Sequence, residues 1–282
     1  MKRLFLLIFS LLLVFACSKP SGEEQPSTPS LSFKKYAGED EVKIMSFNVR
    51  TKTSSDEGVK HWDSRKEACV ALIKDHQPTV IGFQEAKYTS QWSYLKQELA
   101  DDYSGFGVNR DSGLESGKGE VMGILYNKGV VERLDGGTFW LSETPDVPSK
   151  GFGANYSRNA TWGLFRHKPS GKIFYYINTH LDHQVANAQV EGMKLISKRF
   201  EEYKGRYPLF LTGDLNITAD NGAIDPIEGY MYNARAANED YDSAKYRERN
   251  VSNKSHAFNR PFEVNKKGSG FFTDGSYVFH TL

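Results

Sequence analysis

The stretch that decides the fold is YPLFLTGDLNITAD, residues 207–220. Its apolar half, Pro208 to Leu211, is typical of a buried strand, yet it leads directly into Asp214 and Asn216. Burying an unpaired carboxylate or amide costs several kcal/mol, so these groups belong at the mouth of a strand, where they can bind a cation or a polar ligand. Gly, Asp and Asn are also common turn residues. This stretch alone therefore leaves a turn and a site equally open.

Polar side chains follow or flank strand-like runs at four other places in the chain. The segments are MSFNVR with Asn48, IGFQEA with Glu85, GKGEVMGILY with Glu120, and YYINTHLDH with Asn178, His180 and Asp182. A turn explains one such segment, but five that carry oxygen ligands and a histidine indicate a shared site. Carboxylate and amide oxygens suit Mg²⁺ and Mn²⁺. Zinc fits less well, because the sequence has no pair of nearby cysteines and no His-Glu-x-x-His motif.

Strand-like and helix-like runs alternate along the chain from about residue 41. The strand-like runs are 42–48, 80–84, 123–126, 161–165, 173–179 and 209–212, and the helix-like runs are 64–75, 91–99 and 187–203. In the first predicted helix, Ala68, Cys69, Leu72 and Ile73 form one apolar stripe at helical spacing. No internal repeat or linker interrupts the pattern. We therefore expect one α/β domain over residues 41–282, long enough to bury a large core.

The first 40 residues have the composition of an export signal followed by a tether. MKRLFLLIFSLLLVFAC places Lys2 and Arg3 before an apolar run that ends at Cys17, a secretory pattern too short to span a bilayer. The ending at Cys17 resembles a bacterial lipobox, so we expect a lipid anchor in the cell envelope, on the periplasmic or outer side of the outer membrane. Release of a Cys17→Ser variant from membranes would test this. Residues 18–40 predict a flexible tether.

The charge balance weighs against one class of substrate. The formal net charge is +1, and removal of the segment that carries Lys2 and Arg3 would leave −1. Nucleic-acid-binding domains are commonly basic, so the balance favours small phosphodiesters or lipid head groups over long DNA, without excluding a nuclease. With Cys17 lipidated, Cys69 would be alone in the mature chain, and no intramolecular disulfide is expected.

Six motifs resemble the endonuclease/exonuclease/phosphatase superfamily. In chain order they are MSFNVR, WDSRK, FQE, GE…GILY, NTHLDH and GDLN. The segments TFWLSETP and RNATW resemble the secreted bacterial lipoprotein branch of that superfamily. The resemblance implies a four-layer α/β sandwich of two packed mixed β-sheets flanked by helices. It also implies a monomeric, Mg²⁺-dependent phosphoester hydrolase of the phosphodiesterase, nuclease or phosphatase type, in which Mn²⁺ can replace Mg²⁺.

The resemblance assigns the metal and the attacking water to one group of residues. Glu85 would be the principal metal ligand, with Asn48 beside it. Asp214 would orient or deprotonate the attacking water, and Asn216 would hold that water or a phosphate oxygen. These roles agree with the chemistry, because phosphoester hydrolysis needs a Lewis acid, an oriented water and a donor that stabilises developing charge.

A second group of residues would face the substrate. His180 would stabilise charge in the transition state, and Glu120 would fix the tautomer of His180. We also expect Asn178, Asp182 and Arg158 to contact the substrate. The Arg158 guanidinium can grip two phosphate oxygens at once, but a structural salt bridge is an equal alternative for this residue.

The C-terminal part departs from the family pattern. The family ends in a strand followed by Ser-Asp-His, whereas this sequence contains no Ser-Asp-His and ends in FFTDGSYVFHTL. We therefore expect a C-terminally truncated domain that lacks the last strand or strands and part of the catalytic apparatus. This departure leaves a second hypothesis open, a non-catalytic, lipid-anchored surface protein that binds ligands through the retained cleft. Metal-dependent hydrolysis would distinguish the two.

Overall fold

The computed structural model describes residues 42–203, 205–218, 221–228, 230–233 and 276–280. The signal peptide, the lipidated Cys17 and the tether that the sequence predicts lie outside these residues and stay predictions. In the described part, no helix combines the length and the apolar character that a membrane span requires.

The first sheet contains four strands in the order β1-β2-β6-β4. Their bounds are Ile44–Asn48 (β1), Val80–Gln84 (β2), Ile124–Asn127 (β6) and Tyr103–Phe106 (β4). β1 and β2 are parallel, and the other neighbours are antiparallel. Two short strands, Ala86–Lys87 (β3) and Glu120–Val121 (β5), pair separately just beyond β2. The helical segments of this half are Gly58–Lys60 (η1), Trp62–His76 (α1), the π-helical turn Tyr88–Trp92 (η2) and Ser93–Glu98 (α2).

The second sheet contains six strands in the order β11-β12-β10-β9-β8-β7. Their bounds are Tyr232–Asn233 (β11), Ser276–His280 (β12), Leu209–Asp214 (β10), Ile173–His180 (β9), Asn159–His167 (β8) and Val131–Trp140 (β7). β9 and β10 are parallel, and the other neighbours are antiparallel. The helical segments are Ala186–Phe200 (α3), Glu201–Tyr203 (η3), Gly222–Ile224 (η4) and Asp225–Glu228 (α4).

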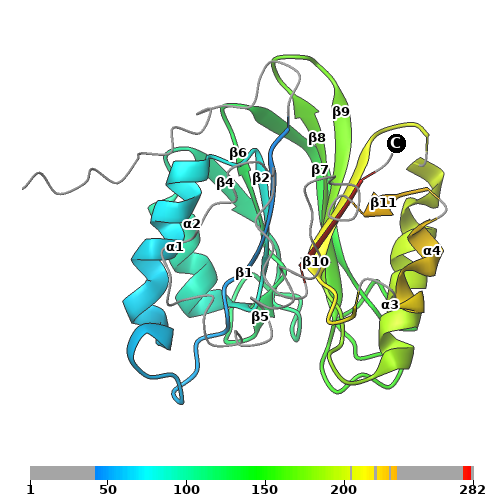
Figure 1. The fold of residues 1–282 in the computed structure, drawn as a ribbon, viewed down its shortest axis with the longest axis horizontal. Helices are drawn as coiled ribbons and strands as arrows, with labels where there is room; N and C mark the ends of the chain where they lie inside the picture. Colours follow the sequence, from blue (N-terminus) through cyan, green and yellow to red (C-terminus); the bar gives the residue numbers. More distant parts are fainter. Residues whose placement is uncertain (1–41, 204, 219–220, 229, 234–275, 281–282) are drawn as a thin grey trace, which may run out of the picture. The chain divides into compact units, whose positions relative to one another are not determined.

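The two sheets pack face to face, and helices cover their outer faces (Figure 1). Helices α1 and α2 lie against the first sheet, and α3 and α4 lie against the second. Three apolar clusters fill the spaces between the layers, and the cluster between the sheets includes the buried side chains of Val80, Ile124, Phe165 and Phe174. This architecture is the four-layer α/β sandwich that the sequence predicts.

Strand β12 covers one edge of β10. It pairs with β10 in antiparallel orientation from Ser276 to His280, and β11 pairs with its other edge. The backbone groups along this edge of β10 are therefore hydrogen-bonded. The structure therefore places a strand at this edge of β10, and the predicted C-terminal truncation stays a prediction.

A buried polar layer fastens the two sheets together. Tyr176 on β9 shares a hydrogen bond of 2.6 Å with Thr212 Oγ1 and donates to the carbonyl of Met45 at 3.3 Å. Gly82 makes room for this contact, because a Cβ atom there would lie 2.4 Å from Tyr176 Oη. A larger residue at position 82 would therefore force the sheets apart.

Asn178 belongs to the same layer. Its amide nitrogen donates to the carbonyl oxygens of Phe83 at 2.8 Å and Gly123 at 3.1 Å, and its Oδ1 atom accepts from Gln84 Nε2 at 2.7 Å. Asn178 is fully buried, and both ends of its amide are occupied between the sheets. The prediction that Asn178 contacts the substrate is therefore wrong.

We expect Asn178→Ala to destabilise the protein markedly. The change removes three buried hydrogen bonds, and each such bond contributes about 0.5–1.5 kcal/mol. A loss of about 3 kcal/mol would lower the melting temperature by about 6–12 °C in a domain of this size. Asn187→Ala is the matched control, because the amide of Asn187 donates to the carbonyl of Phe152 on the exposed surface. Equal melting temperatures for the two variants would contradict this account.

Candidate functional site

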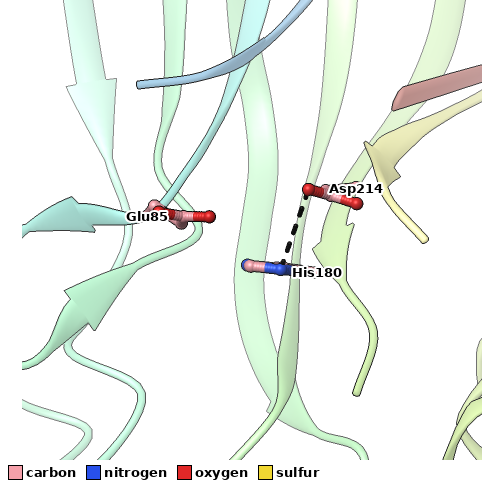
Figure 2. A group of neighbouring side chains, drawn as sticks. All are labelled: Glu85, His180 and Asp214. Atoms are coloured by element: carbon pink, nitrogen blue, oxygen red, sulfur yellow. Dashed lines mark ion pairs between the residues drawn. The ribbon is translucent and has the colours of Figure 1, made fainter. Parts of the chain in front are cut away.

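The candidate site lies where strands from both sheets end. Asn48 is the last residue of β1, and Glu85 directly follows β2. His180 and Asp214 are the last residues of the parallel strands β9 and β10, where they stand opposite one another. The carboxyl ends of parallel strands share one edge of a sheet, which is where ligands bind in many α/β proteins. Figure 2 shows Glu85 approaching His180 and Asp214 from the opposite sheet.

Three of these residues form a group that could hold a metal ion. One ligand atom each from Glu85, His180 and Asp214 lies within 4.8 Å of the others. His180 Nε2 is 3.9 Å from Asp214 Oδ2, the ion pair drawn in Figure 2. Two carboxylates brought together from different sheets repel one another unless a cation lies between them. The donor set fits a divalent ion such as Mg²⁺ or Mn²⁺.

Asn48 connects the two carboxylates. Its Nδ2 atom donates to Glu85 Oε1 and to Asp214 Oδ2, both at 2.9 Å. Its Oδ1 atom accepts from the backbone N–H of Arg50 at 2.8 Å. An amide nitrogen that donates cannot bind a cation, so in this orientation Asn48 positions the two carboxylates. The structure thereby assigns Asn48 a bridging role in place of the metal-ligand role that we expected.

The backbone is strained around these side chains. Five residues other than glycine have positive φ in the described part, and three of them, Arg50, Glu85 and Asn216, lie at this site with φ of 49°, 62° and 52°. Residues held in this region cluster at functional sites. At Glu85 the strained turn aims the carboxylate back across the end of β1, where Oε2 accepts the Thr51 N–H at 2.8 Å.

Asp214 is buried and is held by its neighbours. Oδ1 accepts the backbone N–H of Asn216 at 3.1 Å, and the Asn216 amide donates to the carbonyl of Leu181 at 3.1 Å. Burial raises the pKa of Asp214 to about 6, against the hydrogen bond from Asn48, which lowers it. A carboxyl group whose pKa lies near neutrality suits a proton acceptor. Asn216 therefore lies beside Asp214, as the sequence predicts.

His180 is neutral and has one unused nitrogen. Burial, together with the positive charges of Arg158 and Arg110, holds the pKa of His180 well below its usual range. Its Nδ1 atom is buried and has no hydrogen-bond partner in the described part. We expected Glu120 to occupy this position, but Glu120 instead accepts from Arg110 Nη1 at 2.6 Å. The prediction that Glu120 fixes the tautomer of His180 is therefore wrong.

Asp182 acts on Arg158 and on helix α3. Its Oδ1 atom accepts the backbone N–H groups of Gln184 and Val185, each at 2.9 Å, just before α3 begins. Its Oδ2 atom lies 3.5 Å from Arg158 Nε. Asp182 is almost completely buried, and its contact with the substrate stays a prediction. The salt bridge that was one alternative for Arg158 is confirmed.

Arg158 also has donors to spare. Its side chain is buried, its Nε atom faces Asp182 at ion-pair distance, and its Nη1 atom has no hydrogen-bond partner in the part of the chain that the structure describes. A buried guanidinium with unused N–H groups is costly unless an acceptor arrives. This arrangement fits a bound anion, such as a phosphate, beside the metal-binding group.

Sequence reasoning missed Gln91, which fixes the loop after β1. Its Nε2 atom donates to the Arg50 carbonyl at 2.9 Å, and its Oε1 atom accepts the Lys52 N–H at 2.7 Å. These bonds flank Thr51, whose N–H binds Glu85. The sequence does suggest that Gln91 is buried, because it lies beside Trp92 and four residues before Leu95, on the apolar face of the predicted helix. A buried glutamine needs hydrogen-bond partners, which points to a role in fixing the backbone.

Arg65 holds the same loop from the side of α1. Its guanidinium donates to the carbonyl oxygens of Lys60 at 2.9 Å, Arg50 at 2.6 Å and Val49. Arg65 is buried and lies over the ring of Trp62. Its role is structural, and it supports the site by immobilising the backbone that carries Thr51.

Two similar solved structures with the same fold come from Bacteroides species. An endonuclease/exonuclease/phosphatase from Bacteroides vulgatus is 32% identical, with 85% of this chain and 87% of that chain covered and a TM-score of 0.69. A mannosyl-6-phosphatase from Bacteroides thetaiotaomicron is 28% identical, with 86% and 85% covered and a TM-score of 0.67. An uncharacterised protein of Acanthamoeba polyphaga mimivirus is 26% identical over 199 residues, 66% of this chain and 71% of its own length.

The family assignment follows from two independent matches. The model of the Endonuclease/Exonuclease/phosphatase family matches residues 45–281, which include the four strand ends that form the site. The B. vulgatus structure shares both the layers and nearly a third of the residues. The chain belongs to the Endonuclease/Exonuclease/phosphatase family, whose members include phosphatases and nucleases.

Proposed function

We propose that this protein is a divalent-metal-dependent phosphoester hydrolase that uses Mg²⁺ or Mn²⁺. The observation that carries the proposal is the Asn48 bridge, which holds the carboxylates of Glu85 and Asp214 beside the buried His180. Glu85 and Asp214 would hold the metal. When bound there, the metal would supply a Lewis acid for a non-bridging phosphate oxygen.

Asp214 and Asn216 would prepare the attacking water. The Asp214 carboxylate would orient the water or accept its proton; its raised pKa belongs to the metal-free site, because a nearby cation lowers the pKa of a carboxyl group. The Asn216 backbone N–H fixes Oδ1 of that carboxylate, and Asn48 Nδ2 donates to its Oδ2. The Asn216 side chain is anchored through a single N–H, and its remaining polar groups are in place to orient the water.

His180 and Arg158 would stabilise the negative charge that develops on the phosphate. A neutral imidazole donates through one nitrogen only, and the unpartnered Nδ1 of His180 is the candidate donor. The unused Nη1–H of Arg158 is a second candidate donor. Preorganised donors of this kind stabilise the transition state without costing reorganisation during the reaction.

The substrate we propose is a small phosphoester. The near-neutral charge does not favour a long polyanion, and one similar structure is named for its action on a sugar phosphate, mannosyl-6-phosphatase. Phosphomonoesters and small phosphodiesters, lipid head groups included, are therefore the first classes to assay. The non-catalytic hypothesis would require the same residues to bind without turnover, which these assays would reveal.

The central experiment removes the metal ligand on the first sheet. We expect Mg²⁺-dependent hydrolysis of p-nitrophenyl phosphate or bis(p-nitrophenyl) phosphate by the unmodified protein, and a fall of at least about a hundredfold in kcat/KM for Glu85→Gln. Mg²⁺ affinity measured by calorimetry should fall in parallel.

Glu132→Gln is the matched control, since Glu132 pairs with Arg166 on the exposed edge strand. Its activity and Mg²⁺ affinity should equal those of the unmodified protein. Full activity and unchanged Mg²⁺ affinity in Glu85→Gln would refute the metal assignment.

A second experiment tests the buried carboxyl group. The pKa of Asp214 is about 6 in the folded protein against 3.8 for the ordinary group. Because the folded pKa is raised, ionised Asp214 destabilises the folded state, fully above about pH 6 and not at all below about pH 4, by about 3 kcal/mol. In EDTA, Asp214→Asn should therefore melt higher than the unmodified protein above pH 6, and the two curves should converge near pH 4. A pH-independent difference would contradict the raised pKa.

A further inference from the structure

An exposed aromatic residue stands at the rim of the site. Tyr156 lies in the loop between β7 and β8, and half of it is open to solvent (50%), which makes it one of four large exposed apolar or aromatic side chains in the described part of the chain. Arg158, two residues further along the chain, is buried in the site. An exposed aromatic ring beside the buried polar residues of a site is unusual, because tyrosine normally buries its ring and exposes its hydroxyl.

The ring is held from several sides. It stacks on His183, with ring centroids 5.9 Å apart and planes inclined by 29°. The guanidinium carbons of Arg110 and Arg158 lie 5.6 Å and 6.0 Å from its centroid. Cations near an aromatic face are attracted by the ring. Tyr156 therefore keeps a fixed orientation although it is exposed.

Arg158 connects this ring to the reaction centre. Its Nη2 atom donates to His183 Nδ1 at 3.0 Å, since a guanidinium can only donate. Its Nη1 atom is the unused donor that we assign to the phosphate. A group attached to the phosphate through its ester oxygen would consequently reach the rim at Tyr156 and His183.

Two amides flank the ring. Asn155 directly precedes Tyr156, Gln184 directly follows His183, and the Asn155 amide donates to Gln184 Oε1. Both residues are exposed. The mutual bond leaves Asn155 Oδ1 as an acceptor and Gln184 Nε2 as a donor at the same rim.

We propose that Tyr156 is a specificity-determining residue that stacks on the sugar ring of a sugar phosphate, so that the sugar is the leaving group. A pyranose offers an apolar face of C–H groups to an aromatic ring and hydroxyl groups at its edge, and each hydroxyl both donates and accepts. The Tyr156 ring matches the face, and the paired amides of Asn155 and Gln184 match the edge. This inference rests on the proposed function, because it requires the phosphate to bind at Arg158.

The alternative occupant is a nucleobase, which also stacks on aromatic side chains. A base is joined to its phosphate through a pentose, so it would lie farther from Arg158 than a sugar that carries the phosphate directly. The contact of Arg158 with both the phosphate position and the Tyr156 ring favours the shorter connection. The two occupants give different results in the experiment below.

The test compares substrates that share a phosphate and differ in the leaving group. Glucose 6-phosphate and mannose 6-phosphate carry a sugar ring, glycerol 3-phosphate carries none, and uridine 5′-monophosphate carries a base. We expect Tyr156→Ala to raise KM for a hexose phosphate about tenfold, the loss of roughly 1.4 kcal/mol of binding, with kcat and the rate on glycerol 3-phosphate nearly unchanged. Tyr156→Phe should restore the KM, because the ring is retained.

Val147→Ala is the matched control, since Val147 lies in the same loop and is equally exposed (54%). It should leave every rate unchanged. If Tyr156→Ala lost equal activity on hexose phosphate and glycerol 3-phosphate, the inference about Tyr156 would be overturned and the proposed function would stand. A larger loss on the nucleotide than on the hexose phosphate would also overturn the inference. An unmodified protein that hydrolyses none of the four substrates with Mg²⁺ would overturn the proposed function as well.

Discussion

The site depends on one amide group, Asn48 Nδ2, which donates hydrogen bonds to the carboxylates of both Glu85 and Asp214. Glu85 belongs to the first sheet and Asp214 to the second, so this amide fixes the distance between the sheets where the chemistry would occur. Two backbone features support it. The parallel register of β1 and β2 places Asn48 beside Gln84, and the positive φ of Glu85 turns its carboxylate toward Asn48.

The buried ionisable groups of the site raise the free energy of the folded protein, and a bound ligand could lower it. Asp214 is buried with a raised pKa, His180 is buried and neutral, and Arg158 is buried with unused donors. Each of these groups destabilises the folded protein as long as no ligand binds to it. Active sites are commonly less stable than the surrounding fold for this reason. Here the polar layer of Asn178 and Tyr176 and the apolar core between the sheets offset that cost.

The sequence predicts the strands that are buried on both faces, because their runs are continuously apolar. The predicted strand at 80–84 matches β2, and the strand at 209–212 falls short of β10 by its last two residues, Gly213 and Asp214. Strand β7 was missed. It is an edge strand in which most positions before Phe139 are exposed or half-buried, and it contains two glycines and a bulge between Arg133 and Asp135, so its sequence resembles a loop.

For the site, the strand ends at Asn48, Glu85, His180 and Asp214 were predictable, but the partners of each residue were not. Asn178 and His180 lie on the same face of β9, and only the packing of the other sheet shows that Asn178 is enclosed while His180 is at the open end. Glu120 was assigned to His180 because carboxylates often orient imidazoles, yet Arg110, ten residues away in a loop, lies closer. Which partner a side chain contacts depends on the geometry of the loops, and the periodicity of a sequence does not indicate that geometry.

The most direct measurement of the central claim is anomalous diffraction from crystals soaked in Mn²⁺. The account predicts one strong peak within bonding distance of the carboxylate oxygens of Glu85 and Asp214, and loss or displacement of that peak in crystals of Asn48→Ala. A peak elsewhere, for example at Glu120, would contradict the claim that the two sheets together hold the metal. So would an unchanged peak in Asn48→Ala, because the bridge would then be dispensable.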